Sequence, residues 1–220
     1  MAPWWRTAPG GRGRPWQAGR VRTDFDPRSD DTNTYALLSS LVVPRPIAWV
    51  ASRSADGVGN LAPHSFFTVV CADPPVVAFA SIGDKDTLRN VVATGEFTVS
   101  VATLPLMDQV NDSSARFAPD QDEAAELGVE MRPSTVVGPP AVAASPAAIE
   151  CRLHSTVDLG SSTLVLGEVV WISVEDDVVV DGLPSYDRMQ PVSRLGGPDW
   201  GLPGPTRAVR RPGDPSEIAR

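Results

Sequence analysis

Side chains that build metal sites and covalent catalytic centres are scarce in this chain of 220 residues, which has two cysteines, two histidines and one lysine. Cys71 and Cys151 stand apart in apolar, strand-like runs, so we predict neither a disulfide framework nor a thiolate metal site. Both are expected to be buried small side chains in a reducing cytoplasm. With only His64 and His154 available, a histidine-based zinc site lacks its other ligands, and no metal is predicted.

Long apolar runs and a net positive charge are missing as well. No run approaches the ~20 apolar residues of a membrane-spanning helix. The formal net charge of −8 argues against nucleic acid or an anionic membrane as the main partner. The charge is uneven, because six arginines and two aspartates give residues 1–28 a charge of +4, which leaves −12 for residues 29–220.

The composition divides the chain into one domain and two tails. Residues 1–30 are rich in Gly, Pro and Arg and lack the apolar core of a signal peptide, so we expect a disordered basic extension. A basic, tryptophan-containing arm that touches an acidic partner or nucleic acid is the alternative. Residues 31–200 form the expected domain, and residues 201–220 form a flexible tail rich in Pro and Arg.

Short apolar or alternating runs, separated by turn signals, predict a mainly β fold. Several such strands in succession favour an antiparallel barrel with a few short helices. Pro63 interrupts the ladder of one strand, and such a break often marks an edge or a bulge that faces a ligand. The six predicted strands are residues 47–52, 58–70, 74–81, 96–103, 147–158 and 162–174.

A short helix or a turn is predicted at residues 32–40, and short helices are predicted at residues 104–111 and 121–127. The last of them carries a cluster of carboxylates, which we interpret as a solvated helix face, with a metal site as the alternative. The cluster consists of Asp120, Asp122, Glu123 and Glu126.

The last two predicted strands form a hairpin that turns at Gly160-Ser161. A two-residue turn there places His154 opposite Gly167, and Leu153 opposite Glu168. Glycine inside a strand often marks the close approach of a ligand or of another backbone. His154 is therefore a candidate ligand contact, and an exposed histidine beside a bulge is the other interpretation.

The loop after strand 74–81 has the chemistry of a phosphate site. Residues 82–87 break the strand, and residues 88–94 follow with helical spacing until Gly95. Asp84 or Asp86 is expected to cap this helix. Free amides, Lys85 and the Thr87 hydroxyl then face one point, which suits a phosphate. An ordinary capped surface helix is the alternative.

Seven ordered blocks carry a resemblance to a known family. They are PRPIAWVAS (44–52), GNLAPHSFF (59–67), DPPVVAFAS (73–81), KDTLRN (85–90), GEFTVSV (95–101), LVLGEV (164–169) and SRLGG (193–197). Together they resemble the flavin reductase-like family of FMN-binding split-barrel proteins. That family includes flavoredoxin and the reductase components of two-component flavin monooxygenases. The similarity runs from about residue 31 to residue 200.

The resemblance implies a six-stranded antiparallel Greek-key split barrel that forms a homodimer, with FMN near the subunit interface and FAD as an alternative. It implies a cytoplasmic NAD(P)H-dependent flavin reductase, in which hydride passes from NADH or NADPH to the flavin. Such an enzyme can supply reduced FMN to a partner monooxygenase. A non-catalytic FMN carrier of the flavoredoxin kind is the second interpretation, and a barrel that has lost flavin binding is the third. No catalytic acid, base or nucleophile is needed, because the flavin supplies the electronic machinery.

The resemblance also assigns roles to residues. It implies that residues 85–87 hold the phosphate and that residues 61–65 line the ring and the ribityl chain. Residues 45–49 and 52–53 wall the same pocket. His154, as a catalytic candidate, and Arg194 are implied near the ring or the nicotinamide, from the same or the other subunit. The implied cofactor-binding residues are Arg45, Pro46, Ile47, Ala48, Trp49, Ser52, Arg53, Asn60, Leu61, Ala62, Pro63, His64, Ser65, Ser81, Lys85, Asp86, Thr87, Asn90 and Arg194.

Overall fold

The computed structural model describes residues 22–218 and divides the chain into two units, residues 1–35 and residues 36–220. In the described part of the first unit, Arg28 and Asp26 form an exposed ion pair. Most of the predicted extension lies outside the described residues, as do the last two residues of the predicted tail. The domain limits therefore stay a prediction. The second unit holds every strand described below.

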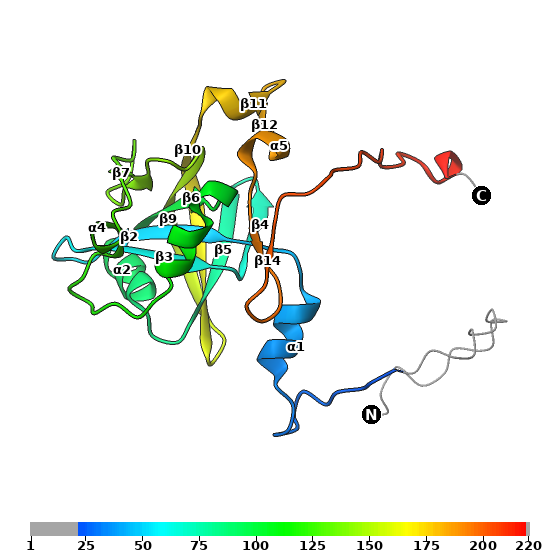
Figure 1. Ribbon diagram of the computed structural model, residues 1–220, viewed down its shortest axis with the longest axis horizontal. Helices are drawn as coiled ribbons and strands as arrows, with labels where there is room; N and C mark the ends of the chain where they lie inside the picture. Colours follow the sequence, from blue (N-terminus) through cyan, green and yellow to red (C-terminus); the bar gives the residue numbers. More distant parts are fainter. Residues whose placement is uncertain (1–21, 219–220) are drawn as a thin grey trace. The chain divides into compact units, whose positions relative to one another are not determined.

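One antiparallel sheet dominates the second unit, with seven strands in the order β3-β2-β6-β9-β10-β5-β4 (Figure 1). The prediction of six strands was short by one, because residues 58–70 form two strands. Their chain changes partner at residues 65–66, where pairing with β2 ends and pairing with β5 begins. The strands are β2 Ala48–Arg53, β3 Gly59–His64, β4 Phe67–Ala72, β5 Pro75–Ile82, β6 Glu96–Val101, β9 Ala147–Asp158 and β10 Ser162–Val174.

The two edges of this sheet, β3 and β4, are consecutive in the chain. The sheet therefore curls into a barrel that is open between them, and the Phe66 carbonyl at the crossing accepts the Ala80 amide at 2.8 Å. Pro63 does not break a strand, since it lies within β3 opposite Trp49. A proline is tolerated there because β3 is an edge strand, and one side of its backbone needs no ladder partner.

Short helices and three small sheets complete the fold. The helices are α1 Thr34–Leu41, α2 Asp86–Thr94, η1 Leu104–Leu106, α3 Met107–Asp112, α4 Glu123–Glu126, η2 Asp176–Val178, α5 Tyr186–Met189 and η3 Pro215–Glu217. The small sheets pair β1 Arg45–Pro46, β13 Ser193–Arg194 and β14 Trp200–Gly201, then β7 Met131–Arg132 with β8 Ala141–Val142, and β11 Val179–Val180 with β12 Leu183–Pro184. None of the helices among residues 22–218 is long and apolar enough to cross a membrane.

Strand β2 is the centre of the core because both of its faces are buried. Its even-numbered residues Ala48 and Val50 pack with Phe79, Phe97 and other side chains of the barrel interior. Its odd-numbered residues face a second apolar cluster, to which η1, α3 and α4 contribute. Burial on both faces explains why this strand reads as a continuous apolar run. The layer formed by α2, α3 and α4 also contacts β3.

The hairpin of β9 and β10 turns where predicted but changes register halfway. Pairing from Thr163 with Asp158 continues to Leu166 with Ser155, and a bulge then places Gly167 opposite Leu153. The predicted pairing of His154 with Gly167 was therefore wrong, and His154 is the extra, exposed residue of the bulge. A Cβ on Gly167 would lie 2.7 Å from Cε1 of Phe97, so this glycine makes room for a core ring.

Candidate functional site

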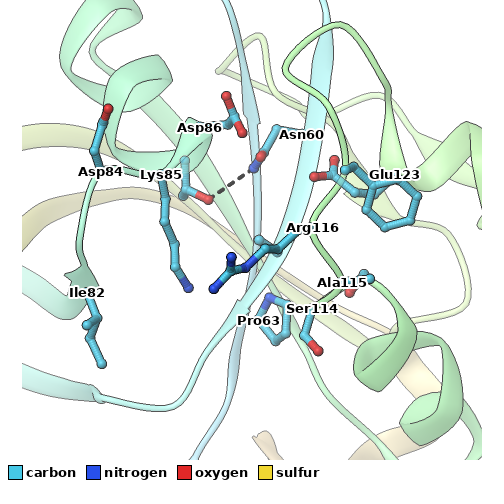
Figure 2. Close-up of a pocket in the computed structure, with 14 residues that line it drawn as sticks. Asn60, Pro63, Ile82, Asp84, Lys85, Asp86, Ser114, Ala115, Arg116 and Glu123 are labelled. Atoms are coloured by element: carbon cyan, nitrogen blue, oxygen red, sulfur yellow. Dashed lines mark hydrogen bonds between the residues drawn. The ribbon is translucent and has the colours of Figure 1, made fainter.

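A cavity of about 530 Å³ lies between the edge strand β3, the N-terminus of α2, and the loop of residues 113–117 that follows α3 (Figure 2). Its lining residues come from four segments that are distant in sequence. They are Asn60, Ala62, Pro63, Ile82, Asp84, Lys85, Asp86, Thr87, Ser113, Ser114, Ala115, Arg116, Phe117 and Glu123. The cavity thus joins the two regions that the sequence singled out, the strand around Pro63 and the loop before α2.

Helix α2 points an uncapped N-terminus at this cavity. Lys85 is its N-cap residue, and no side chain accepts a hydrogen bond from the first amides. The prediction that Asp84 or Asp86 caps the helix was wrong, because Arg89 holds both carboxylates. Its Nη1 lies 2.8 Å from Oδ1 of Asp84, and its Nη2 contacts Oδ1 of Asp86. The helix ends as predicted, with Gly95 in the left-handed region at φ 76°.

A buried polar network supports this helix from below. Asn60 Nδ2 donates to Thr87 Oγ1 at 3.1 Å, the bond drawn as a dashed line in Figure 2, and to Ser52 Oγ at 3.2 Å. Asn90 Nδ2 also donates to Ser52 Oγ, at 3.3 Å. His64 Nε2 lies 3.3 Å from the same Thr87 oxygen. The network ties α2 to β2 and β3, and it fixes the position of the helix N-terminus at the cavity.

His64 is neutral in this environment. Burial, and then the positive charge of Lys85, lower its pKa from 6.5 to about 3, against the opposing effect of a hydrogen bond to the Ala80 backbone. A neutral imidazole has one N–H, which serves the Ala80 carbonyl, so Nε2 accepts the Thr87 proton. Thr87 is 1% exposed, and its hydroxyl is engaged by Asn60 and His64. The Thr87 hydroxyl, which was expected to face a phosphate, thus forms hydrogen bonds within the buried network instead.

The loop of residues 113–117 forms the wall opposite α2 and was missed by the sequence analysis. Its first residue is anchored by the core, because Trp49 Nε1 donates to Ser113 Oγ at 2.9 Å, and this hydroxyl donates to the Val110 carbonyl at 3.0 Å. Arg116 extends from the loop into the cavity (Figure 2). The stretch has no periodicity or motif, so only the fold shows that it borders the site.

Glu123 was wrongly assigned to a solvated face. It is buried on α4, its Oε2 accepts the Leu61 amide at 2.9 Å, and burial raises the pKa of its carboxyl group. Asp122 of the same cluster caps α4 by accepting the amides of Ala124 at 2.9 Å and Ala125 at 3.2 Å. The other two carboxylates of the cluster are exposed, as predicted. Glu123 therefore fixes the edge strand β3 against α4 at the rim of the cavity.

The structure brings only part of the implied cofactor-binding set to this cavity. Asn60, Ala62, Pro63, Lys85, Asp86 and Thr87 line it. Ser52, His64 and Asn90 form the network beneath it. Ile47, Ala48, Trp49 and Leu61 are core residues, so their side chains are not available to a ligand there. Arg53 is exposed at the end of β2, Ser65 lies in the crossing after β3, and Ser81 is buried with no partner for Oγ.

A second group of the implied residues lies on the small sheet of β1, β13 and β14. The guanidinium of Arg45 is buried and donates to the carbonyls of Ser39, of Val42 at 3.1 Å and of Leu195 at 2.8 Å. Pro46 pairs with Ser193, next to the pairing of Arg45 with Arg194. Cζ of Arg194 lies 4.9 Å from the centroid of the Trp200 ring. These residues and His154 do not line the cavity of one chain.

The cavity presents charged side chains of both signs, with Lys85 and Arg116 beside Asp84, Asp86 and Glu123. No histidine or cysteine lines it, and in the described part of the chain no cluster of His, Cys, Asp and Glu could hold a metal ion. Free helix amides with a lysine at the same point favour an anionic group. Ala62 and Pro63 add an apolar edge of β3 next to that anion site. A molecule that carries both an anionic group and an apolar part matches this combination.

Comparisons with known proteins agree on one family. The flavin reductase like domain matches residues 39–190. An uncharacterized protein of Deinococcus radiodurans is 42% identical over 176 residues, which cover 74% of this chain and 77% of that protein. Nitrilotriacetate monooxygenase component B from Bacillus cereus superposes with a TM-score of 0.83 at 27% identity, over 87% of this chain and 100% of that one. A protein with a split barrel domain from Shewanella frigidimarina has a TM-score of 0.73 at 21% identity, over 81% and 91% of the two chains.

Proposed function

The chain belongs to the flavin reductase-like family of split-barrel proteins, and from that premise we propose that it is an NAD(P)H:flavin oxidoreductase that uses FMN. FAD is the alternative flavin. The functional domain of this proposal is residues 31–200. The reaction is placed in the cytoplasm, where the two cysteines, free in the structure, stay reduced.

The observation that carries the proposal is the uncapped N-terminus of α2. A helix of nine residues that presents free amides and Lys85 to a cavity offers an anion site that the protein itself leaves without an acceptor. FMN has a phosphate for this site, whereas riboflavin has none. Lysine suits such a group as a point charge. In this proposal the backbone amides of residues 86–88 and the Lys85 ammonium hold the phosphate, and the Thr87 hydroxyl positions the helix.

When bound, the flavin supplies the chemistry, since its ring accepts a hydride from the reduced nicotinamide. The residues of this chain bind and orient the two reactants. Ala62 and Pro63 on the edge strand provide an apolar wall for the ring, and Glu123 keeps that strand in place through the Leu61 amide. No side chain has to donate or accept a proton in the hydride step, because the role of the protein is to hold the two reactants in the reacting geometry.

We also propose that the product is used by a second protein. The solved structure from Bacillus cereus is named as component B of a nitrilotriacetate monooxygenase. In this proposal a chain with the same fold supplies reduced flavin to a flavin-dependent monooxygenase.

A homodimer is the proposed functional unit. Large apolar side chains are exposed on β4 and β10, among them Val69 at 70% and Ile172 at 61%, with Trp171 beside the latter. Exposed apolar surface often marks an interface. Pairing two copies brings a second set of residues near each cavity. His154 and Arg194, which do not line the cavity of their own chain, are proposed to act from the partner copy.

Steady-state oxidation of NADH and NADPH by the purified protein, with and without added FMN, tests this function. We expect oxidation that depends on the protein and rises with added FMN. The control is the oxidation caused by free FMN alone. Oxidation no faster than this control, by a protein that nevertheless holds FMN firmly, would contradict the reductase and favour a flavin carrier.

A further inference from the structure

Two cations point into the cavity from opposite walls. Lys85 extends from the start of α2 and Arg116 from the loop after α3, with their charged ends directed toward one another (Figure 2). Among residues 22–218, neither side chain forms an ion pair or a hydrogen bond. Like charges directed at one space repel each other unless an anion lies between them.

The carboxylates of the cavity do not supply that anion. Asp84 and Asp86 both pair with Arg89 of α2. Glu123 is buried and accepts the Leu61 amide. Each acidic group of the lining therefore has a partner elsewhere, and within residues 22–218 no acceptor lies between the two cations.

Arg116 lies on a segment that is fixed on both sides. Before it, the core tryptophan Trp49 holds Ser113 through a hydrogen bond of 2.9 Å. After it, the Ala118 amide donates to Gln121 Oε1 at 2.9 Å, and Phe117 is half-buried at the cavity wall. A short segment anchored in this way limits the space that the exposed Arg116 side chain can reach.

We propose that Arg116 is a second phosphate ligand, which closes the anion site from the wall opposite α2. The inference rests on the proposed function, because the phosphate is that of the bound FMN. A guanidinium can donate two parallel hydrogen bonds to phosphate oxygens, whereas the ammonium of Lys85 acts as a point charge. The phosphate is then held by the helix amides and Lys85 on one side and by Arg116 on the other. The loop after α3, for which the sequence offers no motif, becomes part of the binding site.

Dissociation constants of FMN and riboflavin, measured for wild type, K85A, R116A and the double variant, test the proposal. For R116A we expect FMN affinity to fall about ten- to a hundredfold, as for loss of a hydrogen bond to a charged group, with riboflavin affinity unchanged. The effects of K85A and R116A on FMN should not add, because both side chains contact one phosphate. R116K should restore part of the affinity. R207A is the matched control, since Arg207 is exposed on the tail and does not line the cavity.

Wild-type affinity of R116A for FMN would overturn the assignment while leaving the proposed function intact. The same holds if R116A raises the KM for NADH alone, because Arg116 would then contact the nicotinamide substrate. Equal losses for FMN and riboflavin would also overturn it, since they indicate a general disturbance of the site. Failure of the wild-type protein to bind any flavin would instead refute the proposed function itself.

Discussion

Among single residues, His64 has a pKa that its surroundings shift far from the ordinary value. It is buried beneath α2, and its folded pKa of about 3 lies below the ordinary 6.5. Between these values the unfolded chain binds more protons than the folded one, so stability is full above about pH 6.5 and falls as the pH drops. The slope is about 1.4 kcal/mol per pH unit, so we expect a loss of about 2 kcal/mol between pH 7 and pH 5 from this group.

Urea unfolding at the two pH values, for wild type and for His64→Gln, measures this contribution. Glutamine cannot take up a proton, so the variant should lose about 2 kcal/mol less than wild type on acidification. The comparison with a variant is needed because Glu123 also titrates. Its pKa is raised in the folded protein, so its contribution to stability falls as the pH rises, opposite to that of His64. An identical pH dependence for both proteins would show that His64 is not held neutral in the folded state.

The sequence alone pointed to the cavity residues Lys85 and Pro63, but it did not point to Arg116 or to the buried position of Glu123. Lys85 lies at a helix start and Pro63 lies in an edge strand, and both features can be recognised from neighbouring residues in the sequence. The role of Arg116 depends on a hydrogen bond between Trp49 and Ser113, which are far apart in the chain. The role of Glu123 depends on the Leu61 amide of another element. Such tertiary contacts leave no mark in local sequence.

For the elements, local signals predicted where strands turn but not how they stay in register. The turn at Gly160-Ser161 was predicted correctly, because glycine and serine favour a tight hairpin. The pairing of His154 with Gly167 was predicted wrongly, whereas the alternative of an exposed histidine beside a bulge was confirmed, and a ring from β6 packs against Gly167 at this point. Likewise, one predicted strand became β3 and β4 because its two halves pair with different strands.

Gly167→Ala tests this account of the β9–β10 hairpin. The added Cβ would lie 2.7 Å from Cε1 of Phe97 and 3.1 Å from Cβ of Cys151, so the core must shift. We expect a loss of about 1–3 kcal/mol in the free energy of unfolding, as for other overpacked cores. Gly204→Ala is the control, since its Cβ would meet only a backbone oxygen at 4.0 Å. Equal stability of both variants and wild type would contradict the close packing of Phe97 on Gly167.

For the whole molecule, family and fold were predicted from ordered blocks, whereas assembly is not visible in one chain. The proposed homodimer leads to a prediction for Ile172, which is exposed on β10 in the single chain. A charge placed in an apolar interface weakens it strongly. Ile172→Asp should therefore shift the protein from dimer toward monomer in sedimentation at micromolar concentration. A wild-type protein that sediments as a monomer with FMN bound would rule out the dimer as the functional unit.

The affinity of Lys85→Ala for FMN and for riboflavin tests most directly the claim that the cavity at α2 holds a flavin by its phosphate. Loss of the ammonium removes a charge-assisted contact worth about 1.5–3 kcal/mol, so FMN binding should weaken about ten- to a hundredfold. Riboflavin lacks the phosphate, and its affinity should stay at the wild-type value. Equal losses for the two ligands, or no loss for either, would mean that the start of α2 is an ordinary surface helix end and not the phosphate site.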